Sequence, residues 1–184
     1  MEIKKWKILD REYLFKRPWL TARRDKVQLP DGRINPEYYV LEYPDWINVI
    51  AITKTGMFVM VEQYRHGLQD VFTELVGGVI EPGEDPLAAA RRELLEETGF
   101  AGGDWELYMV ISQNPSTSNN YTYCFIARGV EETARQHLDE TEDIAVKLLT
   151  EQEVKNMLVN DQIKQALMAA PLWKYFATKC ISTP

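Results

Sequence analysis

The stretch from Gly78 to Phe100, GVIEPGEDPLAAARRELLEETGF, decides the fold of this chain. Asp85-Pro86 is typical of a helix start, because aspartate caps free backbone N–H groups and proline suits the first helical position. Gly99 suits the left-handed residue that ends a helix. We therefore predict a helix over residues 85–98, preceded by a loop over residues 77–84 in which glycines let the backbone approach a ligand closely.

Three carboxylates lie close together toward the C-terminal end of this predicted helix. Glu93 and Glu97 are one turn apart and project from one face, and Glu96 lies close to that face. Like charges at this spacing repel one another, and the helix dipole disfavours negative charge at this end. A hard divalent cation such as Mg²⁺, which takes oxygen ligands and often bridges to phosphate, would remove the penalty. The spacing alone leaves open a second interpretation, an acidic face in solvent.

The remainder of the chain is predicted to form strands, with further helices near its end. The apolar run Val49–Ile52 is too continuous for a strand with one exposed face, so we expect it to be buried on both faces. Thr150 and Glu153 form a capping-box pattern before another helix, and residues 161–170 and 171–178 are also expected to be helical. The predicted strands span residues 20–29, 37–43, 46–53, 57–63, 71–76, 105–112, 121–127 and 144–149.

Length and composition limit the classes of protein. The chain has 184 residues, and we expect an N-terminal β segment over residues 1–44 and an α/β domain over residues 45–184. Its net charge of −7 argues against binding to nucleic acid, which requires a basic face. Since the sequence has no apolar run of about 20 residues, no secretory signal pattern and only two distant cysteines, we expect a cytoplasmic protein without a membrane span.

Nine positions in the opening stretch follow one specific pattern, Gly-(5)-Glu-(7)-Arg-Glu-Leu-x-Glu-Glu-x-Gly-Phe. They are Gly78, Glu84, Arg92, Glu93, Leu94, Glu96, Glu97, Gly99 and Phe100. Residues 78–100 thereby resemble the Nudix box of the Nudix hydrolases. The resemblance implies an α/β/α sandwich around a mixed sheet, here with a small N-terminal antiparallel hairpin or sheet. It also implies hydrolysis of a nucleoside diphosphate linked to a further group, with Mg²⁺ or Mn²⁺ as cofactor.

The resemblance also implies roles for the residues of the box. Glu93 and Glu97 would be the principal metal ligands, and Glu96 a further ligand or an orienting group. Gly77 would offer its backbone carbonyl to the metal. Glu84 and Arg92 would pair and brace the loop against the helix, and with Glu96 they are expected to support catalysis.

Outside the box, the sequence resembles the ADP-ribose pyrophosphatase branch, which also includes ADP-sugar and GDP-mannose hydrolases. Gln63-Tyr64-Arg65 resembles a strand motif whose arginine contacts phosphate, and Glu74 precedes the box as in that branch. Pro115 stands where the branch carries a proline, and it too is expected to contact substrate. The branch often continues Pro-Gly-Gly, whereas this chain has PSTSNN over residues 115–120, so the sugar is left open.

The acidic segment Asp139–Asp143 resembles the loop that carries the general base in this branch. Glu140 is the first candidate for the base and Glu142 the second. A flexible acidic loop can place a carboxylate over the diphosphate only when substrate is bound. Without the resemblance, the same segment is equally consistent with a solvated turn.

Aromatic residues near the predicted N-terminal hairpin are candidates for stacking on a nucleobase. Trp46, Trp19 and Tyr39 are the residues considered, and each taken alone is more typical of a core or of a dimer interface. In the related enzymes the N-terminal sheet is exchanged between subunits. The resemblance therefore implies a homodimer in which Trp19 or Tyr39 reaches the neighbouring site.

The predicted function is metal-dependent hydrolysis of ADP-ribose or a related nucleoside diphosphate sugar, giving a nucleoside monophosphate and a sugar phosphate. One alternative within the family is a hydrolase of the GDP-mannose or ADP-glucose type. Alternatives from other classes are a non-catalytic module that senses ADP-ribose and a metal-binding protein without turnover. The presence of Glu93, Glu96 and Glu97 together favours the enzyme.

Overall fold

The computed structural model describes residues 2–181, and the side chains of residues up to 179. The chain divides into two compact units, one of residues up to 44 together with 112–121, the other of residues 45–111 together with those from 122 onward. The sequence analysis had assigned residues 112–121 to the larger domain. No helix in the described part of the chain is long and apolar enough to cross a membrane.

The first unit is a three-stranded antiparallel sheet in the order β1-β2-β3, formed by Lys7–Arg17, Leu20–Gln28 and Ile34–Glu42. The sequence predicted β2 and β3 but missed β1. Every residue of β1 is exposed, so the strand has no buried face to impose a period of two on its sequence. The segment 112–121 joins this unit through backbone hydrogen bonds such as Leu41 N–H to the carbonyl of Thr117, at 2.7 Å.

The second unit contains a mixed sheet in the order β10-β5-β6-β4-β9-β7, with β8 paired to β9. Strands β4 and β9 run parallel, while the other pairs are antiparallel. The strands are β4 (Trp46–Thr53), β5 (Phe58–Arg65), β6 (Asp70–Val79), β7 (Phe100–Ala101), β8 (Asp104–Ile111), β9 (Thr122–Glu132) and β10 (Ile144–Leu149).

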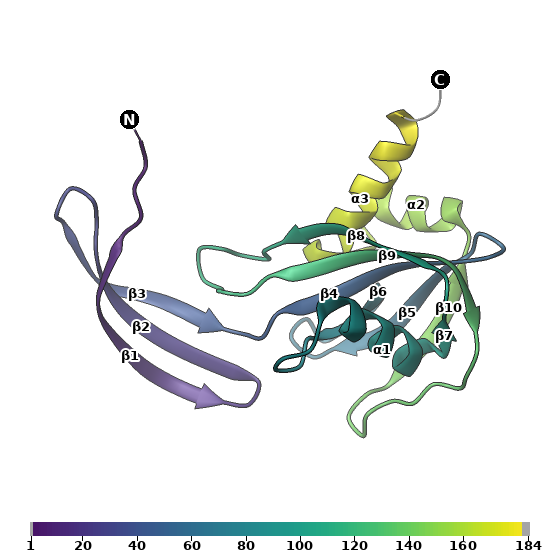
Figure 1. Ribbon diagram of the computed structural model, residues 1–184, viewed down its shortest axis with the longest axis horizontal. Coiled ribbons are helices and arrows are strands. Elements are labelled where there is room, and N and C mark those ends of the chain that lie inside the picture. Colours follow the sequence, from purple (N-terminus) through teal and green to yellow (C-terminus); the bar gives the residue numbers. More distant parts are fainter. Residues whose placement is uncertain (1, 182–184) are drawn as a thin grey trace. The chain divides into compact units, whose positions relative to one another are not determined.

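Helix α1 (Pro86–Thr98) covers one face of this sheet, while α2 (Glu151–Val159) and α3 (Ala166–Ile181) cover the other (Figure 1). Alternate residues of β4 divide between the two layers: Val49 and Ala51 pack with α1, and Ile50 packs with α3. The predicted α/β/α sandwich with a mixed sheet is confirmed. The burial of this strand on both faces is confirmed as well.

The ends of α1 follow the prediction. The Asp85 side chain accepts hydrogen bonds from the N–H groups of Leu87 and Ala88, at 3.0 and 3.1 Å. Gly99 has a φ of 76° and donates its N–H to the carbonyl of Leu95, at 2.8 Å. The capping box of Thr150 and Glu153 is likewise present at the start of α2.

Two other sequence predictions were wrong. The first concerns Gly77 and Gly78, which were expected in a loop but lie within β6, where they pair with Asn48 and Ile47 of β4. Their place in the strand follows from β4, whose apolar run supplies a buried partner for the end of β6.

The second concerns the C-terminal helices, since residues 161–165 are not helical and α3 is one helix that runs through Pro171. Proline has no N–H for the carbonyl four residues before it, which here belongs to Leu167. The buried Asn48 side chain donates from Nδ2 to this carbonyl, at 2.7 Å. The amide of a neighbouring strand thus replaces the helical bond that Pro171 removes.

We predict that Asn48→Ala lowers the free energy of unfolding by about 1–3 kcal/mol, because the buried Leu167 carbonyl loses its donor. In a Pro171→Ala background the cost should be smaller, since the introduced alanine supplies an N–H to the same carbonyl. Urea unfolding of the two single variants and the double variant measures this coupling. The exposed residue Asn156 provides the control, because Asn156→Ala should be additive with Pro171→Ala. Additive effects for Asn48 would contradict the explanation.

Candidate active site

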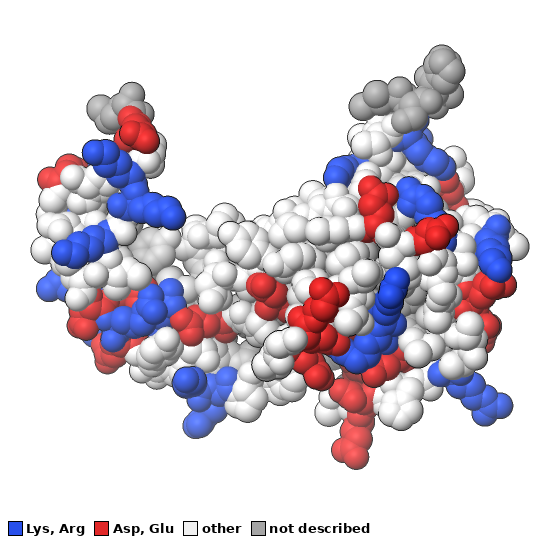
Figure 2. Space-filling model, in the orientation of Figure 1, with Lys and Arg blue, Asp and Glu red and all other residues white. Residues whose placement is uncertain are grey.

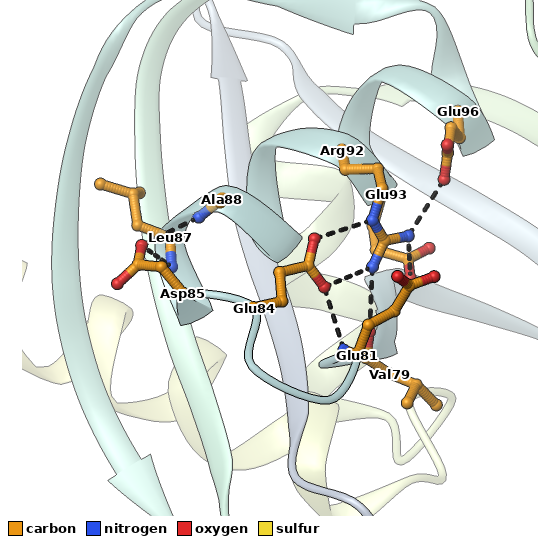
Figure 3. A network of polar contacts seen from close by, with 9 residues as sticks. All are labelled: Val79, Glu81, Glu84, Asp85, Leu87, Ala88, Arg92, Glu93 and Glu96. Carbon is orange, nitrogen blue, oxygen red and sulfur yellow. Dashed lines mark hydrogen bonds and ion pairs between the residues drawn. The ribbon is translucent and has the colours of Figure 1, made fainter.

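Arg92 of α1 is the centre of a polar network within residues 78–100 (Figure 3). Its Nε and Nη2 donate to the two carboxylate oxygens of Glu84, both at 2.9 Å, and Nη2 also donates to the carbonyl of Val79, at 3.1 Å. Its Nη1 donates to Glu93 at 2.8 Å and to Glu96 at 3.1 Å. These bonds use all five N–H groups of the guanidinium.

The same network ties the loop before α1 to the helix. Glu84 accepts, besides the two bonds from Arg92, a bond from the backbone N–H of Glu81 at 3.0 Å. Hydrogen bonding from Arg92 holds the pKa of Glu84 below its ordinary value, and the carboxylates around Arg92 raise the pKa of the arginine. The pair that the sequence suggested is therefore present, with two further carboxylates around the same cation.

Glu93 and Glu97 are carboxylates on the sheet side of α1, the first partly buried and the second buried. Burial is the main cause that raises the pKa of Glu93, opposed by its bond to Arg92. Burial together with the charge of Glu93 raises the pKa of Glu97 to about 8. Glu97 accepts a bond from the backbone N–H of Gly77, at 3.4 Å, and within the described residues no lysine or arginine forms an ion pair with it.

Gly78 gives the Glu93 carboxylate its space. A methyl group placed on Gly78 would lie 2.1 Å from Cδ of Glu93, so a larger residue there would displace the carboxylate. Successive side-chain directions in a strand alternate, and a methyl group on Gly77 would instead lie 3.2 Å from Cε of Met168 on the α3 side. Each glycine therefore admits a close neighbour on a different face of β6.

The donor set of this region fits a hard divalent cation. It comprises the carboxylates of Glu93, Glu96 and Glu97, beside the backbone of Gly77, and oxygen ligands are those that Mg²⁺ and Mn²⁺ take. Buried carboxylates are costly unless positive charge lies nearby. Of the three glutamates, Glu97 has the least positive charge near it. Among the described residues, no three acidic, histidine or cysteine side chains converge closely enough to hold a metal as they stand, because Glu93 and Glu96 turn toward Arg92.

Glu142 of the acidic loop acts electrostatically on the carboxylates of α1. The negative charge of Glu142 acts on both Glu93 and Glu97 and raises the pKa of each. Glu142 also accepts a bond from the backbone N–H of Asp139, at 3.1 Å, which closes the turn. Figure 2 shows acidic side chains gathered on the face of the second unit on which α1 lies, with basic side chains among them.

Arg65 and Glu74 form a partly buried ion pair between β5 and β6. Arg65 donates from Nε and Nη2 to one oxygen of Glu74, at 3.0 and 2.5 Å, and Glu74 is only 2% exposed. The charge of Arg65 partly opposes the rise in the pKa of Glu97. Glu74 thus positions a cation beside the buried carboxylates of α1.

The predicted aromatic and loop contacts divide between the units. Trp46 lies at the start of β4 and lines a pocket of the second unit. Trp19, which is 81% exposed, Tyr39 and Pro115 belong to the first unit. Their contact with substrate, and the catalytic and metal-binding roles of the other residues, stay predictions.

The sequence analysis missed the pocket itself. Its volume is about 280 Å³, and its polar lining includes Asn48 and Gln165, neither of which was singled out. Asn48 could have been found, because it is an amide beside the apolar run of a buried strand. Gln165 stands in a polar stretch before α3, where the sequence gives no comparable signal. Burial raises the pKa of the nearby Cys124 thiol to about 12, which argues against a reactive cysteine here.

Residues 43–169 match the NUDIX domain family, and the chain belongs to that family. Residues 6–41 match the N-terminal domain of nucleoside diphosphate sugar hydrolases. Among curated relatives, the methanol dehydrogenase activator of Bacillus methanolicus is 31% identical over 158 residues, 85% of each chain. The ADP-ribose pyrophosphatase of Bacillus subtilis (strain 168) is 27% identical over 89% of this chain and 88% of its own. A solved structure of an ADP compounds hydrolase superposes over both entire chains with a TM-score of 0.85 at 20% identity, a likeness of fold.

We predict that Mg²⁺ raises the thermal stability of the protein and that Gly78→Ala removes most of this effect. Binding to the folded state contributes roughly 2–3 kcal/mol when free Mg²⁺ is about 100-fold above its dissociation constant. The added methyl would displace the Glu93 carboxylate, a flexible side-chain end, and leave the fold intact. Thermal unfolding with Mg²⁺ and with EDTA measures the difference.

Gly67→Ala is the matched control, because a methyl group at Gly67 meets nothing within 4 Å and the residue has no positive φ. This variant should respond to Mg²⁺ as the parent does. An undiminished Mg²⁺ effect in Gly78→Ala would show that Glu93 does not contribute to the cation site.

Proposed function

We propose that the protein hydrolyses the diphosphate bond of ADP-ribose or a related nucleoside diphosphate sugar, giving a nucleoside monophosphate and a sugar phosphate. The observation that carries the proposal is the position of Glu93 and Glu97 beside Gly77-Gly78, with Arg65 close enough to act on the charge of Glu97. Membership of the NUDIX family and a relative described as an ADP-ribose pyrophosphatase support this substrate class.

The chemistry requires a neutralised diphosphate and an activated water. Glu93, Glu97, Glu96 and the carbonyl of Gly77 would hold Mg²⁺ or Mn²⁺, which polarises phosphoryl oxygens and lowers the pKa of bound water. Arg65, held by Glu74, would contact a phosphate, and Arg92 would keep the loop and helix in register. We propose Glu142 before Glu140 as the general base, because the charge of Glu142 acts on Glu93 and Glu97.

Incubation with Mg²⁺ and a panel of nucleoside diphosphate sugars, followed by assay of released phosphomonoesters, tests the proposal. ADP-ribose should be cleaved, and GDP-mannose and ADP-glucose report on the alternative substrates. Glu97→Gln should lower kcat by about 100-fold or more, because it removes a ligand of the cation that stabilises the transition state. Glu142→Gln should lower kcat more than Glu140→Gln does.

Glu106→Gln is a matched control, since Glu106 is an exposed glutamate of β8, outside the carboxylate group of α1. It should cleave as the parent does. A Glu97→Gln variant that is as fast as the parent would refute the metal assignment. Absence of cleavage, combined with tight binding of ADP-ribose, would instead favour a sensing module.

We propose further that the protein is a homodimer formed through the first unit. Strand β1 exposes apolar side chains along its length; among them are Ile8, Leu9, Leu14 and Phe15. Apolar surface of this kind marks an interaction site. A second copy of the chain is the partner that the family resemblance implies, and a cytoplasmic location stays a prediction.

Size-exclusion chromatography with light-scattering detection should give a mass twice that of one chain. The double change Leu14→Glu and Phe15→Glu should shift the mass to that of a monomer, because it places two charges in the exposed apolar surface of β1. Leu68→Glu, which places the same charge on another exposed leucine in the second unit, should leave the mass unchanged. A parent protein with the mass of one chain would exclude the dimer.

A further inference from the structure

The pocket of the second unit adjoins the candidate cation site at the end of β6, where both Gly77 and Gly78 line it. Gly77 separates the two: its N–H bonds to Glu97, while its opposite side faces Met168, which lines the pocket. Arg65 lines the pocket and also acts on the charge at Glu97. A group held in the pocket would therefore lie next to a phosphate bound at Arg65.

Two buried oxygen atoms in the pocket lining have no hydrogen-bond partner within the part of the chain that the structure describes. One is Oδ1 of Asn48, a residue with 0% exposure. Its orientation is fixed, because Nδ2 of the same amide donates to the Leu167 carbonyl that Pro171 leaves free. The other is Oε1 of Gln165. A buried acceptor without a donor is costly, so both atoms point to a ligand that carries donors.

The remaining walls define the shape of that ligand. Ile47, Leu167 and Met168 are apolar, and Trp46 adds an aromatic face. Such walls suit the flat or apolar face of a ring. A volume of about 280 Å³ accommodates one ring with its substituents.

A nucleoside diphosphate sugar offers a base, the ribose of the nucleoside and a terminal sugar, and the unpartnered atoms favour a sugar over the base. A purine edge alternates donors with ring-nitrogen acceptors, which would themselves need donors from the pocket. A sugar hydroxyl donates directly and can accept from water at the same time. Both sugars are attached to a phosphate without an intervening ring, as the nearness of Arg65 requires. The nucleoside ribose also carries the base, so a pocket for one ring favours the terminal sugar.

We propose that this pocket binds the sugar of the sugar phosphate half of the substrate, with ring hydroxyls donating to Oδ1 of Asn48 and Oε1 of Gln165. The inference rests on the proposed function, and it makes Asn48 and Gln165 the residues that select the sugar. Gln165 carries the test, because Asn48 also supports α3.

The test measures dissociation constants for ribose 5-phosphate, 2-deoxyribose 5-phosphate and AMP, by NMR titration of the ¹⁵N-labelled full chain. The parent should bind ribose 5-phosphate about tenfold more tightly than the deoxy sugar, since one buried hydrogen bond is lost. Gln165→Met should weaken ribose 5-phosphate about tenfold and change AMP by less than about twofold. Gln162→Met, an exposed glutamine three residues earlier, should bind as the parent does.

Two results would overturn the inference. If Gln165→Met weakens AMP as much as ribose 5-phosphate, the pocket holds the nucleoside half instead. If it changes neither, or if the parent does not distinguish the two sugars, the pocket is no sugar site. These measurements report binding, so they do not depend on turnover. A protein that shows the expected binding pattern but cleaves no nucleoside diphosphate sugar would refute the proposed function. The same result would still support the sugar pocket.

Discussion

The five hydrogen bonds of Arg92 are the constraint on which the candidate site depends. They join Glu84 and the carbonyl of Val79, before the helix, to Glu93 and Glu96 within it. The loop and the helix therefore cannot shift independently. A lysine could not replace this arginine, because a single ammonium offers three donors and no planar fork.

The same cation explains how α1 tolerates three acidic residues near its C-terminal end. Their mutual repulsion and the helix dipole both disfavour negative charge at this end of α1. Arg92 compensates two of them directly, Glu93 and Glu96, and leaves the third. Glu97 keeps a raised pKa because it is buried and Arg65 acts on it only at longer range. The unmet charge of this group is thus concentrated on one residue, which is where an added cation would gain most.

The success of the sequence analysis depended on whether the determinants were local. Asp85, Pro86 and Gly99 specify the ends of α1 through their own backbone preferences, so the helix could be predicted to within one residue. Strand β1 could not, because no buried face marks it. The continuity of α3 through Pro171 depends on Asn48, which lies far earlier in the chain, and no local rule contains that contact. The box residues were found by their spacing, whereas the partners of Arg92 beyond Glu84 emerged only from the folded geometry.

Asn48 links the fold to the chemistry of the pocket. The Nδ2 group of Asn48 donates to the Leu167 carbonyl of α3, and its Oδ1 has no partner among the described residues. Because both atoms belong to one planar amide, the bond from Nδ2 also fixes the direction of Oδ1. Were residue 171 able to donate, Leu167 would be satisfied within α3 and would not need the Asn48 amide as a donor. Pro171 removes a helical hydrogen bond, and the Asn48 amide replaces that bond through Nδ2. Pro171 therefore explains why Oδ1 of Asn48 is left without a partner among the described residues. Gly77 and Gly78 complete the arrangement from β6, since one admits Met168 on the pocket side and the other admits Glu93 on the α1 side. Close approach at both faces of one strand therefore places the pocket lining and the carboxylates of α1 on either side of two consecutive glycines.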